Sequence, residues 1–235
     1  MNKLNILSGG AAQGLVASLA PAFKTQTGFD IAGEFGAVGA MADKLRGGMP
    51  TDIVILTAAL LATLAEEKLV VAASISDVGL VETALAVRAG DPKVAARDEA
   101  ALRDALLASD AIFVPDTKTS TAGIHVASVL ARLGIADTVA ARLTIFPNGA
   151  TAMRALAASD ARRPIGCTQS TEIISTTGVV LSGSLPPGYE LATMYTAGIT
   201  TKAAQPSQAS ALIGLLIGAG QREQRERAGF ISAQK

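Results

Sequence analysis

Short apolar runs alternate with segments of helical spacing along most of the chain. Residues 4–9 form the first apolar run, and residues 11–28 follow with apolar side chains three or four positions apart until Gly28. Runs of the first kind are typical of buried strands, and segments of the second kind are typical of amphipathic helices. We therefore predict strands over 4–9, 29–36, 51–60, 82–90, 111–118, 141–148 and 163–173, the last including its loop. The helices predicted between them cover 11–28, 37–48, 61–69, 99–109, 122–135 and 150–159.

The final part of the chain follows the pair Pro186-Pro187. Residues 189–203 predict one or two strands, and residues 206–230 predict one long closing helix. Regular alternation of strand and helix indicates parallel sheets with helices on both faces. A length of 235 residues suits one large domain or two lobes of about 100 residues each. The predicted fold class is therefore α/β.

Six loops lead from a predicted strand into a predicted helix, and they share one composition. Each is rich in small residues, mainly Gly, Ser, Thr and Ala: SGGAAQG, FGAVGAM, TAAL, PDTKTSTAGIH, PNGATAM and CTQSTEI. Ligands of open α/β sheets bind beyond the carboxyl ends of the strands, and the first amides of a helix carry positive potential without an intrahelical partner. Several such helix starts would bind an anion without basic side chains. The alternative for each loop is a plain helix cap and turn.

Composition and charge exclude several classes of function. Lys plus Arg and Asp plus Glu both number 20, so the formal charge is zero, and no basic stripe for nucleic acid is present. The absence of Trp argues against a surface that stacks on bases. Cys167 and His125 are the only residues of their types, which excludes a disulfide within the chain and most zinc sites. We expect no nucleic-acid partner, no metal and no cofactor.

The sequence also bears on membranes and on the cellular compartment. No run of about 18 apolar residues is present, so we expect no membrane span. The first ten residues, MNKLNILSGG, lack the apolar stretch of about 7–15 residues and the cleavage site of a secretory signal. The sequence as it stands therefore predicts a cytoplasmic protein, with a periplasmic one as the alternative if the chain is a processed form. If the protein is exported, a transporter permease is a possible partner.

Four segments in order give the chain its resemblance to a known family. They are residues 6–56, 114–135, 146–160 and 211–230. With this order and spacing the chain resembles the type II periplasmic solute-binding protein superfamily, in particular its molybdate-binding branch, over nearly its whole length.

The resemblance implies a type II fold with two Rossmann-like lobes and a ligand cleft between them. Lobe one would comprise residues 1–83 and 193–235, and lobe two residues 84–192. The resemblance further implies chain crossings near Thr83–Val87 and near Ala192–Tyr195, and these would act as hinges when the lobes close on a ligand.

The resemblance also implies which residues contact the ligand. Ala11 takes the position of a Ser that follows the first strand in molybdate-binding relatives, and Ser8 lies close to it. Val38 and Gly39 stand where a second Ser is expected, and Gln169 stands where a Tyr is expected. A longer ligand that carries carboxylates suits these Gly-rich loops and the amide side chain better than a compact tetrahedral anion. The predicted ligand-binding residues are Ser8, Gly9, Gly10, Ala11, Gly39, Ala40, Thr57, Ser120, Thr121, Asn148, Thr168, Gln169 and Ser170.

Aconitate isomerase resembles the molybdate-binding branch and moves a double bond in a tricarboxylic acid. Such a shift needs groups that remove and return a proton and contacts that stabilise the developing charge. The catalytic candidates are Lys118, in the loop before a predicted helix, and His125, about one turn into that helix. Glu172 is a third candidate. Each has a structural alternative, namely a solvated lysine, a packing histidine and a charge at a helix start, and Cys167 is expected to be a small core residue.

Two functions of different classes follow. The first, which we favour, is a solute-binding protein that closes two lobes on a small anion, with a carboxylate preferred over molybdate. The second is an isomerase of small polycarboxylates that uses the same cleft. A cytoplasmic sensor domain is a third interpretation. The two leading functions share the binding of a carboxylate-type anion.

Overall fold

A computed structural model describes residues 2–231 of the chain. The chain divides into two compact units. We refer to residues 1–81 with 193–235 as unit 1 and to residues 82–192 as unit 2. The chain passes from one unit to the other after Val81 and after Ala192. The sequence places the first of these boundaries after residue 83, which lies in the same strand, β4 (Ser76–Arg88).

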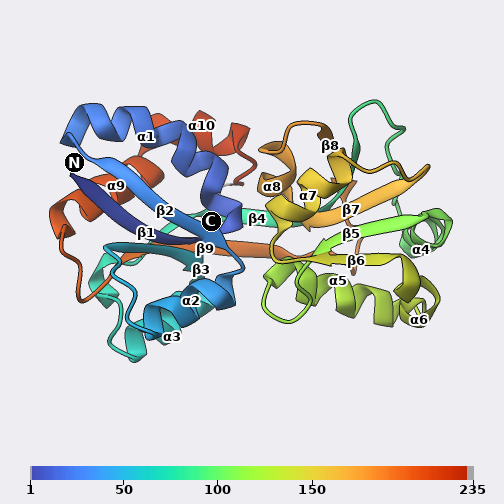
Figure 1. The fold of residues 1–235 in the computed structure, drawn as a ribbon, viewed down its shortest axis with the longest axis horizontal. Coiled ribbons are helices and arrows are strands. Elements are labelled where there is room, and N and C mark those ends of the chain that lie inside the picture. The colour runs from blue at the N-terminus through green and yellow to red at the C-terminus, as the bar shows by residue number, and fades with distance from the viewer. Residues whose placement is uncertain (1, 232–235) are drawn as a thin grey trace. The chain divides into compact units, whose positions relative to one another are not determined.

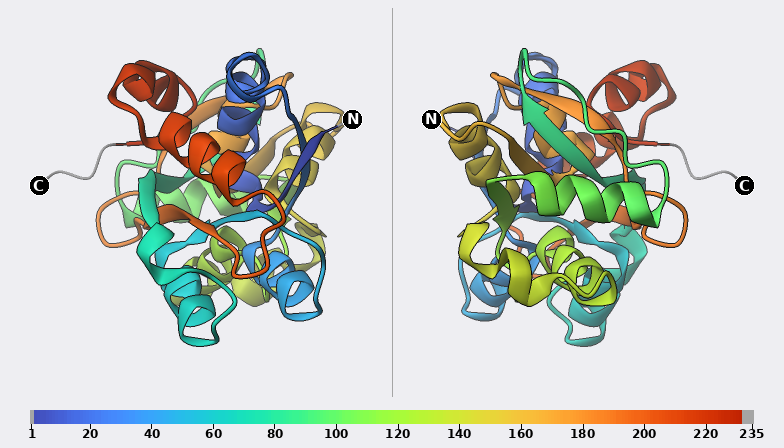
Figure 2. Two further views of the ribbon diagram at one scale, coloured as in Figure 1. Left: turned by 90° about the vertical axis from the view of Figure 1, so that its left-hand side faces the viewer. Right: turned by 90° about the vertical axis from the view of Figure 1, so that its right-hand side faces the viewer.

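Unit 1 is built on a sheet in which the strands follow the order β2-β1-β3-β9 (Figure 1). In Figures 1 and 2, helices α1, α9 and α10 lie on one side of this sheet, and α2 and α3 lie on the other. The strands are β1 Lys3–Gly9, β2 Asp30–Gly36, β3 Ile53–Thr57 and β9 Ala192–Ile199. The helices are α1 Gln13–Thr27, α2 Val38–Arg46, α3 Ala58–Glu66, α9 Pro206–Ile217 and α10 Arg222–Arg227, with 3-10 turns at Gly10–Ala12, Ala72–Ser74 and Ala219–Gln221.

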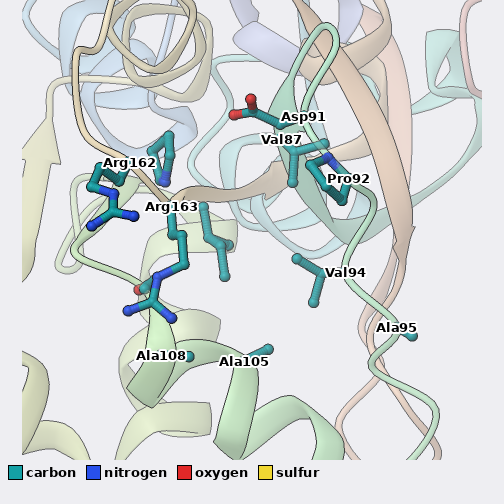
Figure 3. A pocket seen from close by; sticks show the side chains of 12 residues that line it. Val87, Asp91, Pro92, Val94, Ala95, Ala105, Ala108, Arg162 and Arg163 are labelled. Carbon is teal, nitrogen blue, oxygen red and sulfur yellow. The ribbon is translucent and has the colours of Figure 1, made fainter.

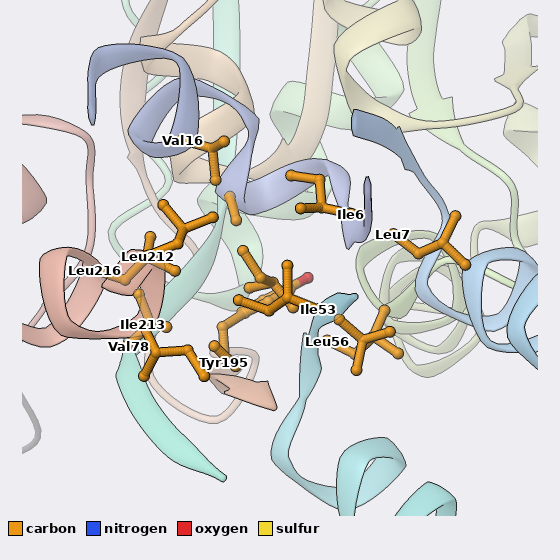
Figure 4. Packing of buried hydrophobic residues seen from close by; sticks show 14 of the residues in the cluster. Ile6, Leu7, Val16, Ile53, Leu56, Val78, Tyr195, Leu212, Ile213 and Leu216 are labelled. Atoms are coloured by element: carbon orange, nitrogen blue, oxygen red, sulfur yellow. The ribbon is translucent and has the colours of Figure 1, made fainter. Parts of the chain in front are cut away.

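The side chains that are buried in unit 1 lie at the apolar positions that the sequence pattern predicts. Leu15, Leu19 and Phe23 are buried on one face of α1, and residues 53–56 of β3 are all buried. Side chains from β1, β3, β9 and α9 belong to the same cluster (Figure 4). Helix α1 ends where Gly28 takes a φ of 73°, a left-handed end that glycine adopts without strain. The helix therefore stops at the residue that the sequence indicates.

Unit 2 is built on a second sheet, with the order β4-β7-β5-β6 and with β8 paired to β4. Helices α7 and α8 lie on one side of it and α5 and α6 on the other (Figure 1). Besides β4, the strands are β5 Ala111–Pro115, β6 Leu143–Phe146, β7 Pro164–Gln169 and β8 Val179–Ser184. The helices are α4 Glu99–Ala108, α5 Thr121–Arg132, α6 Ala136–Val139, α7 Gly149–Ala157 and α8 Ser170–Ile174, with a 3-10 turn at Ala140–Arg142.

Helix length bears on the expectation about membranes. Within residues 2–231 no single helix has the length and apolarity needed to cross a bilayer. Residues 121–132 and 136–142 meet both conditions only when they are taken together, and the two segments are bent by 118°.

The pairing of the strands confirms the expected parallel sheets in part. β1 is parallel to β2 and β3, and β5 is parallel to β6 and β7, as predicted. However, β9 is antiparallel to β3, and β4 is antiparallel to both β7 and β8. β4 and β9 carry the chain from one unit to the other. Neither strand is therefore joined to its neighbour in the sheet by a strand–helix–strand crossover, the connection that parallel pairing requires.

The single long helix predicted over residues 206–230 is wrong. α9 ends at Ile217, Gly218 is extended with φ −55° and ψ 141°, and a 3-10 turn leads into α10. Glycine is a poor helix former, and two of the four residues between α9 and α10 are Gly218 and Gly220. The Arg225 guanidinium donates to the carbonyls of Leu216 and Gly218 at 3.0 and 2.8 Å. It thereby satisfies acceptors that the end of a helix leaves unpaired.

Replacement of Arg225 by Ala should lower the free energy of unfolding by about 1–2 kcal/mol, because two carbonyl groups lose a charged donor. Urea unfolding followed by circular dichroism measures this loss. Arg222→Ala is the matched control, because Arg222 is exposed and, among residues 2–231, pairs only with Glu226 one turn away, an interaction worth about 0.3–0.5 kcal/mol. Equal losses in the two variants would contradict the capping role of Arg225.

Candidate functional site

The carboxyl end of β1 brings together four of the predicted ligand-binding residues. Ser8, Gly9, Gly10 and Ala11 are all buried, and the Ser8 hydroxyl donates to the Gly9 carbonyl at 2.9 Å. A Cβ on Gly9 would lie 2.8 Å from Val38 Cγ1, closer than carbon atoms pack. Glycine at this position therefore lets the end of β1 approach α2.

The starts of α2 and α3 carry the other predicted contacts of unit 1. Gly39 and Ala40 are half-buried in the first turn of α2, and Ala37 before them offers no side-chain cap. The first amides of α2 therefore have no acceptor within the helix or from a capping side chain. At α3 the arrangement differs, because Thr57 Oγ1 accepts the Leu60 N–H at 3.4 Å. Thr57 is thus a helix cap.

In unit 2 the loop after β5 is shaped by an aspartate. Asp116 Oδ1 accepts the backbone N–H of Lys118 at 2.8 Å and that of Thr119 at 2.7 Å. These bonds lower the pKa of Asp116, with the Lys118 N–H as the largest cause. Ser120 is buried at the N-cap of α5 without a side-chain capping bond, and Thr121 is half-buried. The first amides of α5, like those of α2, therefore have no acceptor from a capping side chain.

The two catalytic candidates differ in their surroundings. The Lys118 side chain is exposed. His125 is half-buried, and its Nε2 lies 2.7 Å from the Tyr189 carbonyl oxygen. A carbonyl only accepts, so Nε2 carries the proton in this contact. Arg132 donates to the neighbouring Gly188 carbonyl at 2.7 Å. One of the two imidazole nitrogens is therefore engaged in holding the 188–189 segment.

Glu172 is the buried acid of unit 2. Its carboxylate accepts the Thr168 hydroxyl at 2.6 Å and also accepts the backbone N–H groups of Gln169, Ala150 and Gly149. Burial raises the pKa of Glu172, and these four hydrogen bonds oppose the rise. Two of the amides belong to the first turn of α7. The Glu172 side chain therefore already supplies an acceptor to the first amides of α7.

Gly149 and Asn148 complete that helix start. Asn148 Oδ1 caps α7 by accepting the Thr151 N–H and the Thr151 hydroxyl, both at 2.9 Å. A Cβ on Gly149 would lie 1.9 Å from Glu172 Oε2, so only glycine allows the carboxylate to reach these amides. The predicted contacts Asn148 and Thr168 thus have partners within unit 2.

The Gln169 side chain has no such partner. It is 3% exposed, and neither its amide oxygen nor its amide nitrogen has a hydrogen bond within the protein. Thr83 lies directly opposite Gln169 in the β4–β7 pairing. The hydroxyls of Thr83 and Thr171 are likewise buried without a partner. Buried polar groups are nearly always paired, so this cluster of four atoms is the least satisfied polar region of unit 2 among the described residues.

Some of these residues could not be found from the sequence. Thr83 and Thr171 were not predicted, because a threonine in a strand or at a helix start is usual and only burial without a partner distinguishes it. The same holds for Thr193 and Thr196 of β9, whose hydroxyls are also buried without a partner. Ser170, which was predicted, is buried beside Gln169.

The described residues hold no group of three or more His, Cys, Asp or Glu side chains that could bind a metal ion. Cys167 is buried, as expected of a core residue, and burial raises the pKa of its thiol to about 12. A thiol with that pKa is not a nucleophile near neutral pH.

The raised pKa of Glu172 predicts a pH dependence of stability. Its contribution is fully present below the ordinary pKa of 4.5 and is lost as the pH rises through the raised folded-state pKa. Glu172→Gln removes this titration, so the free energy of unfolding should fall less on going from about pH 4 to pH 8 than in the wild type. Urea unfolding at a series of pH values measures the difference. The exposed Glu66 gives the control: Glu66→Gln should keep the wild-type slope, and a parallel profile for Glu172→Gln would contradict the prediction.

The sequence of this chain is similar to those of known bacterial proteins. Residues 4–231 match the model of a family described as bacterial extracellular solute-binding protein. An aconitate isomerase from Pseudomonas sp. is 25% identical over 224 residues, which cover 91% of this chain and 81% of that protein.

Solved structures give the same fold. The periplasmic molybdate-binding protein of Azotobacter vinelandii superposes with a TM-score of 0.81 at 20% identity, covering 98% of this chain and 100% of that one. The sulfate-binding protein SubI of Mycobacterium tuberculosis H37Rv gives 0.76 at 17% identity, covering 100% and 88%. The type II solute-binding fold expected from the sequence is confirmed.

Proposed function

We propose, from the premise that this chain belongs to the bacterial extracellular solute-binding protein family, that it binds a small carboxylate in preference to molybdate. The family membership and the fold support anion binding. The preference for a carboxylate rests on the residues of this chain, and above all on Gln169.

The Gln169 amide carries the proposal. Its nitrogen is a donor and its oxygen an acceptor, and both are buried without a partner within the protein. Each buried group of this kind costs about 1–3 kcal/mol when it stays unpaired. Fully ionised molybdate offers only acceptors and would leave the amide oxygen unpaired. A carboxylic acid that also bears a hydroxyl offers both an acceptor and a donor.

The helix starts support the charge of the ligand. The α2 start in unit 1 and the α5 start in unit 2 lack a side-chain cap, and uncapped amides with the helix dipole favour an anion. Ser120 and Thr121 are accordingly the contacts proposed for a carboxylate group in unit 2, and Gly39 and Ala40 are those proposed in unit 1. The start of α7 is not included, because Glu172 already accepts its amides.

The positions of Ala11, Gly39 and Gln169 support the same preference. They lack the Ser, Ser and Tyr that the resemblance to molybdate-binding proteins leads one to expect. Loss of these hydroxyls removes donors to a compact oxyanion, whereas backbone amides remain. Delivery of the bound solute to a transporter permease completes this proposal if the protein acts outside the cytoplasm.

A thermal-shift panel tests the ligand class. Citrate, malate, tricarballylate, cis-aconitate, molybdate and sulfate are compared at equal concentration, and a ligand at 100 times its Kd stabilises the folded state by about 2.7 kcal/mol. Citrate and malate, which bear a hydroxyl, should raise the melting temperature more than tricarballylate and cis-aconitate, which do not, and molybdate should not raise it. Gln169→Ala should abolish the effect of the best acid, whereas the half-buried Gln208 of α9 gives the control Gln208→Ala, which should keep it. A larger rise with molybdate than with any organic acid would refute the preference.

A second candidate function is isomerisation of a polycarboxylate. The relative named aconitate isomerase, 25% identical over 91% of this chain, favours it. The proton transfer would fall to Lys118, whose side chain is exposed in the loop before α5, or to His125 on α5. Anion contacts proposed above would stabilise the charge that develops on the substrate.

Conversion of cis-aconitate to trans-aconitate, followed by proton NMR with purified protein, tests the enzyme. If Lys118 moves the proton, Lys118→Met should lower kcat at least about 100-fold, a typical contribution of general acid–base catalysis. Lys202→Met, at an exposed lysine of unit 1, is the control and should leave kcat unchanged. No interconversion of the two isomers by the wild type would leave binding as the function.

A further inference from the structure

Unit 2 contains a cavity that none of the predicted ligand-binding residues lines. Its volume is about 340 Å³, within the range of about 300–1,000 Å³ that is typical of small-molecule sites. Its walls come from the end of β4, the loop that follows it, the last turn of α4 and the start of β7 (Figure 3). All of these segments belong to unit 2.

Most of the wall is apolar. Eight of the twelve lining residues are Ala, Val, Ile or Pro, among them Val87, Val94, Ala105 and Ile165. Ala105 and Ala108 are three positions apart on α4 and so lie on one face of that helix. Their small side chains leave the cavity open where a Leu would fill it. The wall therefore suits a hydrocarbon chain or ring.

The charged lining residues are Asp91, Arg162 and Arg163. Asp91 is already engaged, because its Oδ2 pairs with Arg88 Nε at 2.8 Å. Between residues 2 and 231, neither the Arg162 nor the Arg163 guanidinium has an ion pair or a side-chain hydrogen bond; Asp110 accepts only their backbone N–H groups, at 3.0 and 2.9 Å. The charge left to a ligand is therefore positive.

The loop over the cavity is held at Asp91, which pairs with Arg88, and at Val94. Residues 91–97 contain no helix or strand, and the Val94 N–H donates to Ser182 Oγ of β8 at 2.6 Å, while that hydroxyl lies 3.3 Å from the Val94 carbonyl. This contact fixes Val94 as part of the wall. The cavity is thus formed by residues that the fold positions, not by the loop alone.

We infer that this cavity binds an apolar monocarboxylate, such as a medium-chain fatty acid, with its chain against Val94 and Ala105 and its carboxylate on Arg162 and Arg163. A neutral apolar molecule would give the guanidinium groups no acceptor. A small polycarboxylate would bring further negative charges against apolar walls, which is unfavourable. The site therefore takes a different class of ligand from the polar acids proposed above, and it does not depend on that proposal.

Titration calorimetry of the whole protein with octanoate tests the inference. Octanoate should bind, whereas 1-octanol and succinate, which lack the charge and the chain respectively, should each bind at least about tenfold more weakly. The double variant Arg162→Ala/Arg163→Ala should weaken octanoate binding at least about tenfold through loss of charged hydrogen bonds. Arg103→Ala is the control, because Arg103 is exposed on α4 and does not line the cavity, and it should leave the affinity unchanged.

Ala105→Leu provides an independent readout, because the larger side chain should occupy the cavity and lower octanoate affinity without removing a charge. The melting temperature of Ala105→Leu shows whether the fold is retained. If it is not, the double variant at the exposed Arg162 and Arg163 still tests the site. No octanoate binding at millimolar concentration, equal binding of octanol, or wild-type affinity in the double arginine variant would each overturn the site. The citrate response of these variants should stay at the wild-type level, so failure here is distinguishable from failure of the proposed function.

Discussion

Backbone amides at the starts of helices need acceptors, and the helix starts of this protein differ in whether a side chain supplies one. At α3 the acceptor is the hydroxyl of Thr57, and at α7 it is the Asn148 side chain together with the Glu172 carboxylate. At α2 and α5 no side chain of the capping residue accepts a bond. A solute with negative charge gains most where the chain has not already provided an acceptor. The difference among helix starts therefore removes two of the six similar loops, those before α3 and α7, from the candidates for a ligand.

Glu172 shows why residue type alone does not identify an anion site. PNGATAM and CTQSTEI have the composition of anion-binding loops, and the sequence assigned both to the ligand. In the structure they bind each other, since Glu172 from the second loop accepts the first amides of α7. Gly149 is required for that contact because any side chain would overlap the carboxylate. An acid and a glycine that are 23 positions apart in the chain thus form one unit, which no local pattern reveals.

The fold was predictable where local chemistry is decisive. The buried face of α1 follows from the spacing of Leu15, Leu19 and Phe23, and its end follows from Gly28. The break after α9 was missed because no Pro interrupts residues 207–230 and Gln, Arg and Glu, which are good helix formers, follow Gly220 directly. Gly218 and Arg225 decide where the helix ends. β8 was missed because its short run, VVLSGS, mixes apolar residues with Gly and Ser. For the site, Gln169 stood out as a departure from a family pattern, but the threonines beside it, and the arginines at the cavity, are distinguished only by burial and by the partners they lack.

The neighbourhood of Gln169 also constrains the charge of a ligand. Its backbone N–H donates to Glu172, so a buried carboxyl group lies next to the residue whose side chain has no partner. When Glu172 is ionised, a compact dianion close to the Gln169 amide is repelled, and in a buried setting this repulsion is weakly screened. A neutral hydroxyl or a single carboxylate oxygen meets the amide without that penalty. Under the proposed function, a carboxylic acid that bears a hydroxyl would place the hydroxyl at the Gln169 amide and keep its charge away from Glu172, which a tetrahedral dianion does not do.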